Sequence, residues 1–352
     1  MQRTIYITVF RIAILTVLLA LLIDTLFVQV VIPQQYEFSN VKKIKRLIEM
    51  DRNDEVPIFG SSIAKRSYIP DSIGQGYYNY GMAGSVFAML EPLLKIELEK
   101  DKDTPILIDF EHHFFLSHEE IRFQMSNYIP HVDQPYIREM LKERGLFRYQ
   151  YDIPGLRLFG QYDDYLLDLL RLRFNREYAN KGGLFFKDKQ KDLTLYRTRR
   201  ARMIVEMKEL RLLAEENPRL LTSDKRYKLE LLDILLNSRP DAEYITRFES
   251  LLSTNPDRDF VLIYSPQNEI KLMGLENHDE VSELLQGLDE KWSNLHVLDY
   301  SMAGFSDGYY HDSGHMNIRG ALRFSEMIRQ DMERLFPEDP TLWTPQFTPQ
   351  ER

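Results

Sequence analysis

Short apolar runs alternate with amphipathic segments along most of the chain. Five of the runs have the length and continuity of buried strands, whereas the segments between them repeat apolar residues at helical spacing. The predicted strands lie at 56–59, 105–110 and 259–264, with two more beginning at Tyr77 and His296, and predicted helices lie at 87–100, at 280–292 and after Asn317. Strands that alternate with helices predict an α/β fold with a mostly parallel five-stranded sheet and helices on both faces.

The stretch between the third and fourth predicted strands has a different pattern of apolar and polar residues. From about 116 to 255 helical patterns dominate, so we predict a large helical insertion in the sheet domain. Its helices are predicted at 137–146, 165–173, 193–216 and 225–237, and loops are predicted at 159–164 and 181–186.

The first apolar segment resembles a membrane span. Residues 12–33 are hydrophobic almost throughout, apart from Asp24, and are about long enough to cross a hydrocarbon core of about 30 Å. Ser39 or Asn40 could cap a short amphipathic stalk helix that follows. The predicted organisation is a transmembrane signal anchor at 1–34, a stalk at 35–52, an α/β domain at 53–335 and a C-terminal tail at 336–352.

The orientation of this anchor depends on opposing signals. Arg3 and Arg11 precede the apolar run and no convincing cleavage site follows it, so we predict an uncleaved, single-pass anchor in the cell membrane. The α/β domain would then lie outside the cytoplasm. A cleaved signal peptide or a buried hairpin is the alternative. Basic residues prefer the cytoplasmic side, and four that follow the run favour the reverse orientation: Lys42, Lys43, Lys45 and Arg46.

Composition narrows the classes of function. The chain has 352 residues, 43% of them hydrophobic, and a formal net charge of −9. It therefore has ample residues for a core, and it lacks the basic excess that nucleic-acid binding needs. It has no cysteine, which excludes disulfides, thiolate nucleophiles and cysteine-ligated metals. We expect no nucleic-acid partner and no cofactor.

The candidate chemistry begins where the first strand ends. Gly60-Ser61-Ser62 would lie at the carboxyl edge of the sheet, where open α/β sheets bind ligands, and a hydroxyl there is a candidate nucleophile. Serine needs a base that a third group orients, and Asp312 and His315 stand on one loop before the last helix. By itself such a pair is more often a helix cap beside a surface histidine. Backbone N–H groups of the turn at 81–85 could supply an oxyanion site.

Three short blocks, in this order, resemble those of the SGNH (GDSL-type) hydrolase superfamily. They are F-G-S-S after the first strand, N-Y-G-M-A-G after the second and D-S-G-H-M-N before the last helix. The resemblance implies a flavodoxin-like, three-layer SGNH fold. It implies that Ser62 is the nucleophile, with Ser61 in place of the usual aspartate, and that His315 and Asp312 complete a catalytic triad. The N–H groups of Ser62 and Gly84 would be the oxyanion donors.

The third family block departs from this pattern. It is usually G-x-N-D, whose asparagine donates to the oxyanion, whereas residues 108–114 contain no asparagine. A histidine can donate where a carboxylate cannot, so His112 or His113 could replace it. These histidines, together with Ser61 and with Asn79 of the second block, are weak candidates for binding substrate. Zinc-ligand types occur in this run, but their spacing does not support a metal site, and none is predicted.

The Gly-Ser-Ser block and the N-terminal anchor resemble the membrane-tethered branch of the superfamily. That branch includes the D-alanyl transfer protein of teichoic-acid modification and the alginate and cellulose O-acetylation proteins. The resemblance implies a serine acyltransferase or esterase that acts on a cell-envelope polysaccharide through an acyl-Ser62 intermediate. Its partners would be an acyl donor, a glycan acceptor and a membrane-bound O-acyltransferase. The alternative is a degenerate relative that binds glycan or acts as a scaffold for such an acyltransferase, and a small-molecule lipase or thioesterase is disfavoured.

Overall fold

The computed structural model describes residues 2–32, 39–50, 54–115, 125–153, 156–158, 178–186, 191, 193–236 and 240–345. The helix predicted at 165–173 and the loop predicted at 159–164 lie outside these residues. The chain divides into two compact units. The first comprises residues 1–51, 92–99 and 122–176, and the second comprises residues 52–91, 100–121 and 177–352. The second unit contains the sheet and all the predicted site residues.

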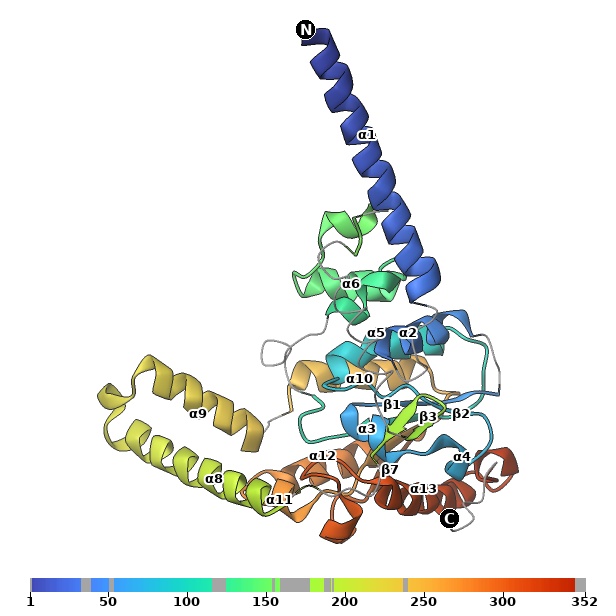
Figure 1. Cartoon of the computed structure of the whole chain (residues 1–352). Coiled ribbons are helices and arrows are strands. Elements are labelled where there is room, and N and C mark those ends of the chain that lie inside the picture. Colours follow the sequence, from blue (N-terminus) through green and yellow to red (C-terminus); the bar gives the residue numbers. More distant parts are fainter. Residues whose placement is uncertain are drawn as a thin grey trace. The chain divides into compact units, whose positions relative to one another are not determined.

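The first unit contains the N-terminal apolar helix. α1 (Gln2–Leu26) continues into one π-helical turn, η1 (Phe27–Val31), and the stretch Ile5–Val31 is long and apolar enough to cross a membrane (Figure 1). The Ser39 hydroxyl accepts the Lys42 N–H and caps the helix that follows, as predicted. The other described elements of this unit are α2 (Asn40–Glu49), η3 (Met125–Asn127), η4 (Ile129–His131), α6 (Pro135–Glu143) and η5 (Tyr149–Asp152).

The second unit is built on a five-stranded sheet in which all neighbouring strands are parallel, as predicted. Its order is β2-β1-β3-β6-β7, and the strands are β1 (Val56–Phe59), β2 (Tyr77–Asn79), β3 (Ile106–Phe110), β6 (Phe260–Tyr264) and β7 (Leu295–Asp299). This is a doubly wound order with its topological switch point between β1 and β3. Ligands of such sheets bind outside the carboxyl ends of the strands at that point.

Side chains of both sheet faces are buried, which explains why the strands are continuous apolar runs. Along β6, Val261 and Ile263 belong to a core that α13 (Ile318–Leu335) covers with Phe324 and other apolar residues. The alternate residues Phe260 and Tyr264 make ring contacts on the other face, with Phe248 and Phe110 respectively. The remaining helices are α3 (Ser62–Ser67), α4 (Pro70–Ile73), α5 (Phe87–Leu98), α10 (Ala242–Thr254), α11 (Glu269–Leu272) and α12 (His278–Lys291).

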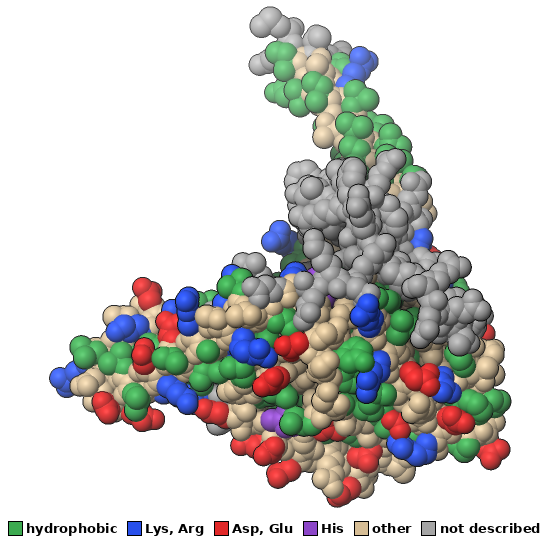
Figure 2. Space-filling model, turned by 60° about the horizontal axis from the view of Figure 1, so that its bottom comes forward, with side chains coloured by type: hydrophobic (Ala, Val, Ile, Leu, Met, Phe, Trp, Pro, Cys, Tyr) green, Lys and Arg blue, Asp and Glu red, His purple; other side chains and the backbone are tan. Residues whose placement is uncertain are grey.

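Part of the predicted insertion is a helical pair. The helices predicted at 193–216 and 225–237 are α8 (Leu193–Glu216) and α9 (Ser223–Leu236), which lie side by side in Figure 1. Their contact is a small core of its own that contains Met207, Leu210, Leu232 and Leu236. Lys, Arg, Asp and Glu side chains are interspersed over the outer surface of this pair (Figure 2).

One segment predicted as a loop, 181–186, is a β-hairpin. β4 (Tyr178–Asn180) and β5 (Gly183–Phe185) pair antiparallel. Lys181 and Gly182 form the turn, with φ angles of 37° and 85°, and positive φ at both central residues is the geometry that two-residue hairpin turns favour. The loop prediction was wrong because strands of three residues are too short to display an alternating pattern.

The described part of the C-terminal tail packs on the sheet unit. Its short helix η8 (Pro340–Leu342) places Leu342 in the core, 3% exposed. The Tyr77 hydroxyl donates to the Leu342 carbonyl at 2.8 Å, and the Gln75 N–H donates to Thr341 at the same distance. Residues up to Thr344 are therefore part of this fold.

Candidate active site

The turn at Gly60-Ser61-Ser62 joins β1 to α3 at the switch point. Gly60 has a φ of 149°, and a Cβ there would lie 2.6 Å from the Cβ of Asp109 and 2.7 Å from that of Ala64. Only glycine therefore lets the chain turn this close to β3. The Met82 N–H donates to the Gly60 carbonyl at 2.9 Å, so the turn that follows β2 lies beside it.

The two serines of this turn have different environments. Ser61 is buried and caps α3, because its hydroxyl oxygen accepts the Ile63 N–H at 3.1 Å and its O–H donates to Glu111. Ser62 is partly exposed and is the first residue of α3. Ser62 is thus the hydroxyl that a substrate could reach, whereas Ser61 holds the turn in place.

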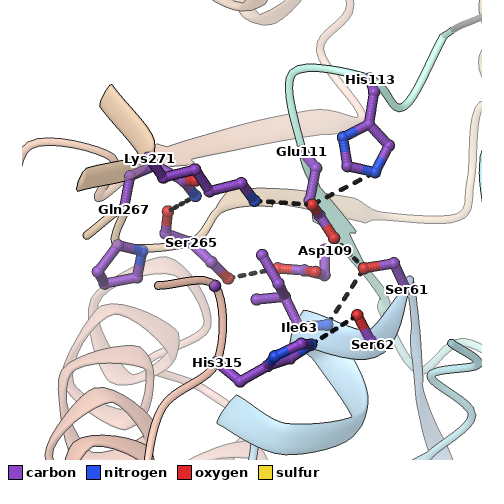
Figure 3. Close-up of polar contacts among 12 residues, drawn as sticks. Ser61, Ser62, Ile63, Asp109, Glu111, His113, Ser265, Gln267, Lys271 and His315 are labelled. Atoms are coloured by element: carbon purple, nitrogen blue, oxygen red, sulfur yellow. Dashed lines mark hydrogen bonds and ion pairs between the residues drawn. The ribbon is translucent and has the colours of Figure 1, made fainter. Parts of the chain in front are cut away.

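The loop before α13 brings a histidine and an aspartate to Ser62. His315 Nε2 lies 2.9 Å from Ser62 Oγ, and His315 Nδ1 lies 2.9 Å from Asp312 Oδ1. Asp312 Oδ1 also accepts the N–H groups of Gly314 and His315, at 3.0 and 2.9 Å. Figure 3 shows the His315 ring turned toward Ser62. The structure therefore joins Ser62, His315 and Asp312 in one chain of hydrogen bonds.

The electrostatics of this chain keep Asp312 ionised. Burial by itself would raise the pKa of Asp312, but the hydrogen bond and charge of His315, together with the two backbone N–H groups, lower that pKa well below its usual range. Lys191 Nζ lies 3.6 Å from the other carboxylate oxygen. An ionised carboxylate on Nδ1 leaves Nε2 of a neutral His315 to accept a proton from Ser62.

A network of charged side chains lies at the end of β3, in the run 108–114 that was compared with the third SGNH block. Glu111 accepts hydrogen bonds from Ser61 and from Lys271 Nζ, the latter at 2.9 Å, and His113 Nε2 lies 3.3 Å from it (Figure 3). Burial would raise the pKa of Glu111, but Lys271, His113 and the hydrogen bond from Ser61 together outweigh it and keep the pKa well below normal. Glu111 thus stabilises the turn at Ser61 by accepting a hydrogen bond. It lies in the run where the resemblance predicts an oxyanion donor.

Asp109, which lies on β3 two residues before Glu111, has the opposite protonation state. It accepts hydrogen bonds from the Tyr68 hydroxyl, at 2.7 Å, and from Ser265. Burial, with the negative charge of Glu111 nearby, raises the pKa of Asp109 to about 8. Two carboxyl groups two residues apart are therefore separated into one neutral acid and one carboxylate at neutral pH.

The weaker predicted site residues have structural surroundings. Asn79 is fully buried, donates to the Ala64 and Tyr68 carbonyls at 2.8 and 3.0 Å, and accepts the Gly81 N–H at 2.9 Å. These bonds clamp α3 to the turn after β2, so Asn79 positions the backbone and does not face a ligand. Gly84 lies exposed in that turn with a φ of 73°, and its Cβ position opens to free space.

The two histidines of the third block differ in exposure. His113 turns its Nε2 toward Glu111, and its side chain is 31% exposed. His112 is 4% exposed, its Nδ1 has no hydrogen-bond partner among the described residues, and burial lowers its pKa well below the usual value. Neither imidazole is among the groups that the described contacts bring to Ser62. Backbone N–H groups therefore remain the oxyanion donors to consider, and N–H groups in the first turn of a helix have no helical acceptor.

Sequence reasoning missed the residue that packs against the loop of Asp312 and His315. The Phe186 ring stacks on His311 at 3.7 Å between centroids, lies under the Arg66 guanidinium at 3.7 Å, and meets His315 edge-on at 6.1 Å. The Phe186 carbonyl also accepts the Ile318 N–H at the start of α13. Phe186 directly follows β5, in the segment predicted as a loop, so no periodic signal pointed to it.

Lys271 was missed as well, although a signal existed. It lies on α11, shortly after the carboxyl end of β6, and polar residues after parallel strands meet at the edge of the sheet.

Neither the family models nor the curated proteins include a match for this chain. Among the described residues, no group of three or more His, Asp or Glu side chains is arranged to hold a metal ion. What the arrangement can do is transfer a proton from a serine hydroxyl to an oriented imidazole.

Proposed function

We propose that this protein is a membrane-anchored serine acyltransferase or esterase of the SGNH type, and that it acts on a cell-envelope polysaccharide outside the cytoplasm. The observation that carries the proposal is the chain of hydrogen bonds from Asp312 through His315 to Ser62, with 2.9 Å at each step. Its place at the switch point of a parallel sheet supports an SGNH-type fold, because that is where such sheets bind ligands.

The proposed reaction has two steps. Ser62 Oγ attacks the carbonyl carbon of the acyl donor while its proton passes to His315 Nε2, and the collapsing intermediate expels the leaving group, which takes that proton. An acceptor hydroxyl then loses its proton to His315 Nε2 and attacks the acyl-Ser62 ester, and Ser62 Oγ leaves with that proton, which restores the free serine and the neutral imidazole. Asp312 fixes the imidazole tautomer and stabilises the imidazolium in both steps. The N–H groups of Ser62 and Gly84 are the proposed oxyanion donors.

The N-terminal helix supports a location at the cell envelope. A largely apolar span of 27 residues, Ile5–Val31, would keep the sheet-bearing unit at a membrane, near acyl donors and polymers that a diffusing esterase would meet less often. A sugar hydroxyl as acceptor makes the protein a transferase, and water makes it an esterase. A membrane-bound O-acyltransferase is the proposed supplier of the acyl group.

A serine-directed probe tests the nucleophile. The full-length protein, in membranes or detergent, should be labelled covalently by a fluorophosphonate, and Ser62→Ala should abolish both the labelling and acyl-ester turnover. Ser313→Ala is the matched control, because Ser313 lies in the same loop as Asp312 and His315 but has no role in the mechanism. Labelling that persists at wild-type level in Ser62→Ala would show that another residue is the nucleophile.

The presence of Glu111 where an oxyanion donor was sought favours a second candidate, a glycan-binding or scaffold protein without catalysis. The same experiment distinguishes the two. A correctly folded wild-type protein that neither reacts with the probe nor turns over any acyl ester, but binds envelope glycan in a sedimentation assay, would support the second candidate.

A further inference from the structure

The first unit presents a second apolar surface besides its N-terminal helix. Outside α1 and η1, the exposed large hydrophobic side chains described in this unit lie within eight residues of each other: Tyr149 is 86% exposed, Ile153 47% and Leu156 38%. We call residues 147–153 and 156–158 the collar. Water-exposed apolar residues gathered in one segment usually mark a contact with a partner or a membrane.

The collar is hydrogen-bonded to α1 at Asp24. The Leu158 N–H donates to Asp24 Oδ1 at 3.3 Å, Leu158 is fully buried, and Asp24 is 6% exposed. The single acidic residue of the apolar span is therefore satisfied by the collar. A hydrocarbon core of about 30 Å holds about 20 helical residues, so a span that begins at Ile5 reaches its boundary near Asp24. With the span placed this way, the collar would meet the helix at the depth where hydrocarbon gives way to headgroups.

The other side of the same helical turns carries exposed apolar side chains. Leu22, Leu26 and Val30 follow one another at intervals of four residues and are 65%, 50% and 43% exposed, whereas Phe27 and Ile32 are buried within the unit. Figure 2 shows hydrophobic side chains along the rod of α1. One face of the helix end thus contacts the unit while the other remains suited to lipid, which is the arrangement expected at a membrane interface.

The chemistry of the collar matches a headgroup layer. Tyr149 is a ring with a polar tip, a type enriched at membrane interfaces, and the exposed residues beside it include Arg148 and Lys142. Lys142 Nζ lies 5.2 Å from the centre of the Phe147 ring, so basic and aromatic groups share this surface. Basic groups next to a membrane attract the anionic phosphates of lipid headgroups.

We propose that the collar inserts into the lipid headgroup layer beside α1 and forms a second membrane contact that fixes the first unit against the bilayer. The proposal rests on the proposed anchoring of α1. Two attachment points restrict the rotation and tilt of an anchored unit, which a single helix leaves free. The contact is with lipid, and no partner protein is needed for it.

The absence of cysteine makes a direct test possible. Single substitutions Tyr149→Cys and Ile153→Cys, made in the full-length chain, carry an environment-sensitive fluorophore, and the protein is reconstituted in vesicles of zwitterionic and anionic phospholipid. Lipids with a spin label near the headgroup quench only a fluorophore at that depth. Leu15→Cys on the exposed face of α1 is the reference for the anchor, and Lys208→Cys on α8 is the reference for a position in water.

We expect loss of fluorescence for the labels at residues 149 and 153 with the shallow quencher, and for the label at residue 15 with a quencher deep in the chains. Quenching at residue 15 but not at residues 149 and 153 overturns the collar contact and leaves the anchor intact. No quenching at any of the three shows that the anchor itself is wrong. Because Tyr149 and Ile153 are exposed, their replacement does not disturb the core, and a wild-type melting profile checks this.

Discussion

Two adjacent serines show how neighbouring residues of one type acquire different roles. Ser61 is buried between the Ile63 N–H and Glu111, so its hydroxyl is fully engaged in holding the turn. Ser62 is partly exposed and its Oγ lies 2.9 Å from His315. The same turn supplies both, because a helix cap residue points back into the protein while the next side chain points outward. The environment, and not the residue type, selects Ser62 as the candidate nucleophile.

At the same scale, replacing Asp312 with asparagine tests the role of its negative charge while keeping the shape of the side chain. Asp312→Asn keeps an oxygen for the Gly314 and His315 N–H groups but removes the negative charge that orients and stabilises the imidazole. If the proposed mechanism holds, kcat should fall by about 10⁴-fold with little change in thermal stability. Steady-state turnover of an acyl ester, with melting measured in parallel, provides the test. An activity within a few-fold of wild type would remove Asp312 from the mechanism.

The approach of Ser62 to Asp312 and His315 was predictable although 253 residues separate Ser62 from His315. The prediction came from three blocks whose residues and order resemble those of the SGNH superfamily, and the sheet edge is where residues that follow parallel strands meet. Lys271 illustrates the limit of that rule. Its partner Glu111 is 160 residues away, and a four-residue helix with no periodicity carries it. Nothing local in the sequence specifies such a pairing.

At the scale of elements, the buried strands and long helices were predicted best. A strand buried on both faces is a continuous apolar run, and a capped amphipathic helix such as α13 has both a periodic pattern and a start signal at Asn317. The hairpin of β4 and β5 has neither, and it is the element that brings Phe186 to the loop of Asp312 and His315.

The hairpin therefore gives an element-scale prediction. Phe186→Ala removes the ring between Arg66 and His311 and the edge contact with His315. We expect kcat to fall by about 10- to 100-fold with KM little changed, because a displacement of a base by about 1 Å can cost that much. Phe186→Tyr keeps the stack and should retain most of the activity. If Phe186→Ala loses activity only in proportion to the fraction unfolded, Phe186 has no positioning role.

At the scale of the whole molecule, one strand end links stability to pH. Asp109 lies on β3 and Glu111 directly follows this strand, and Lys271 forms an ion pair with Glu111. Burial and the negative charge of Glu111 favour the neutral form of Asp109, and they outweigh the hydrogen bonds from Tyr68 and Ser265, which lower its pKa. The sheet unit is thus stable with one proton on this pair, and removing that proton places a second negative charge in the core.

The stability of the fold should consequently fall as the pH rises. The pKa of Asp109 is about 8 in the folded protein, whereas a carboxyl in an unfolded chain titrates near pH 4, so between these values the folded state holds a proton that the unfolded state lacks. Because the folded state binds one more proton than the unfolded state, the free energy of unfolding falls by about 1.4 kcal/mol for each pH unit, up to about pH 8.

Asp109→Asn, which is permanently neutral, should abolish that slope and gain stability relative to wild type as the pH rises. Urea midpoints of the detergent-solubilised full chain at about pH 5 and about pH 8 measure it. Asp257→Asn replaces an exposed carboxyl and should keep the wild-type slope. An unchanged slope in Asp109→Asn would mean that Asp109 is ionised in the folded protein and that the charge on this strand end is balanced by other groups.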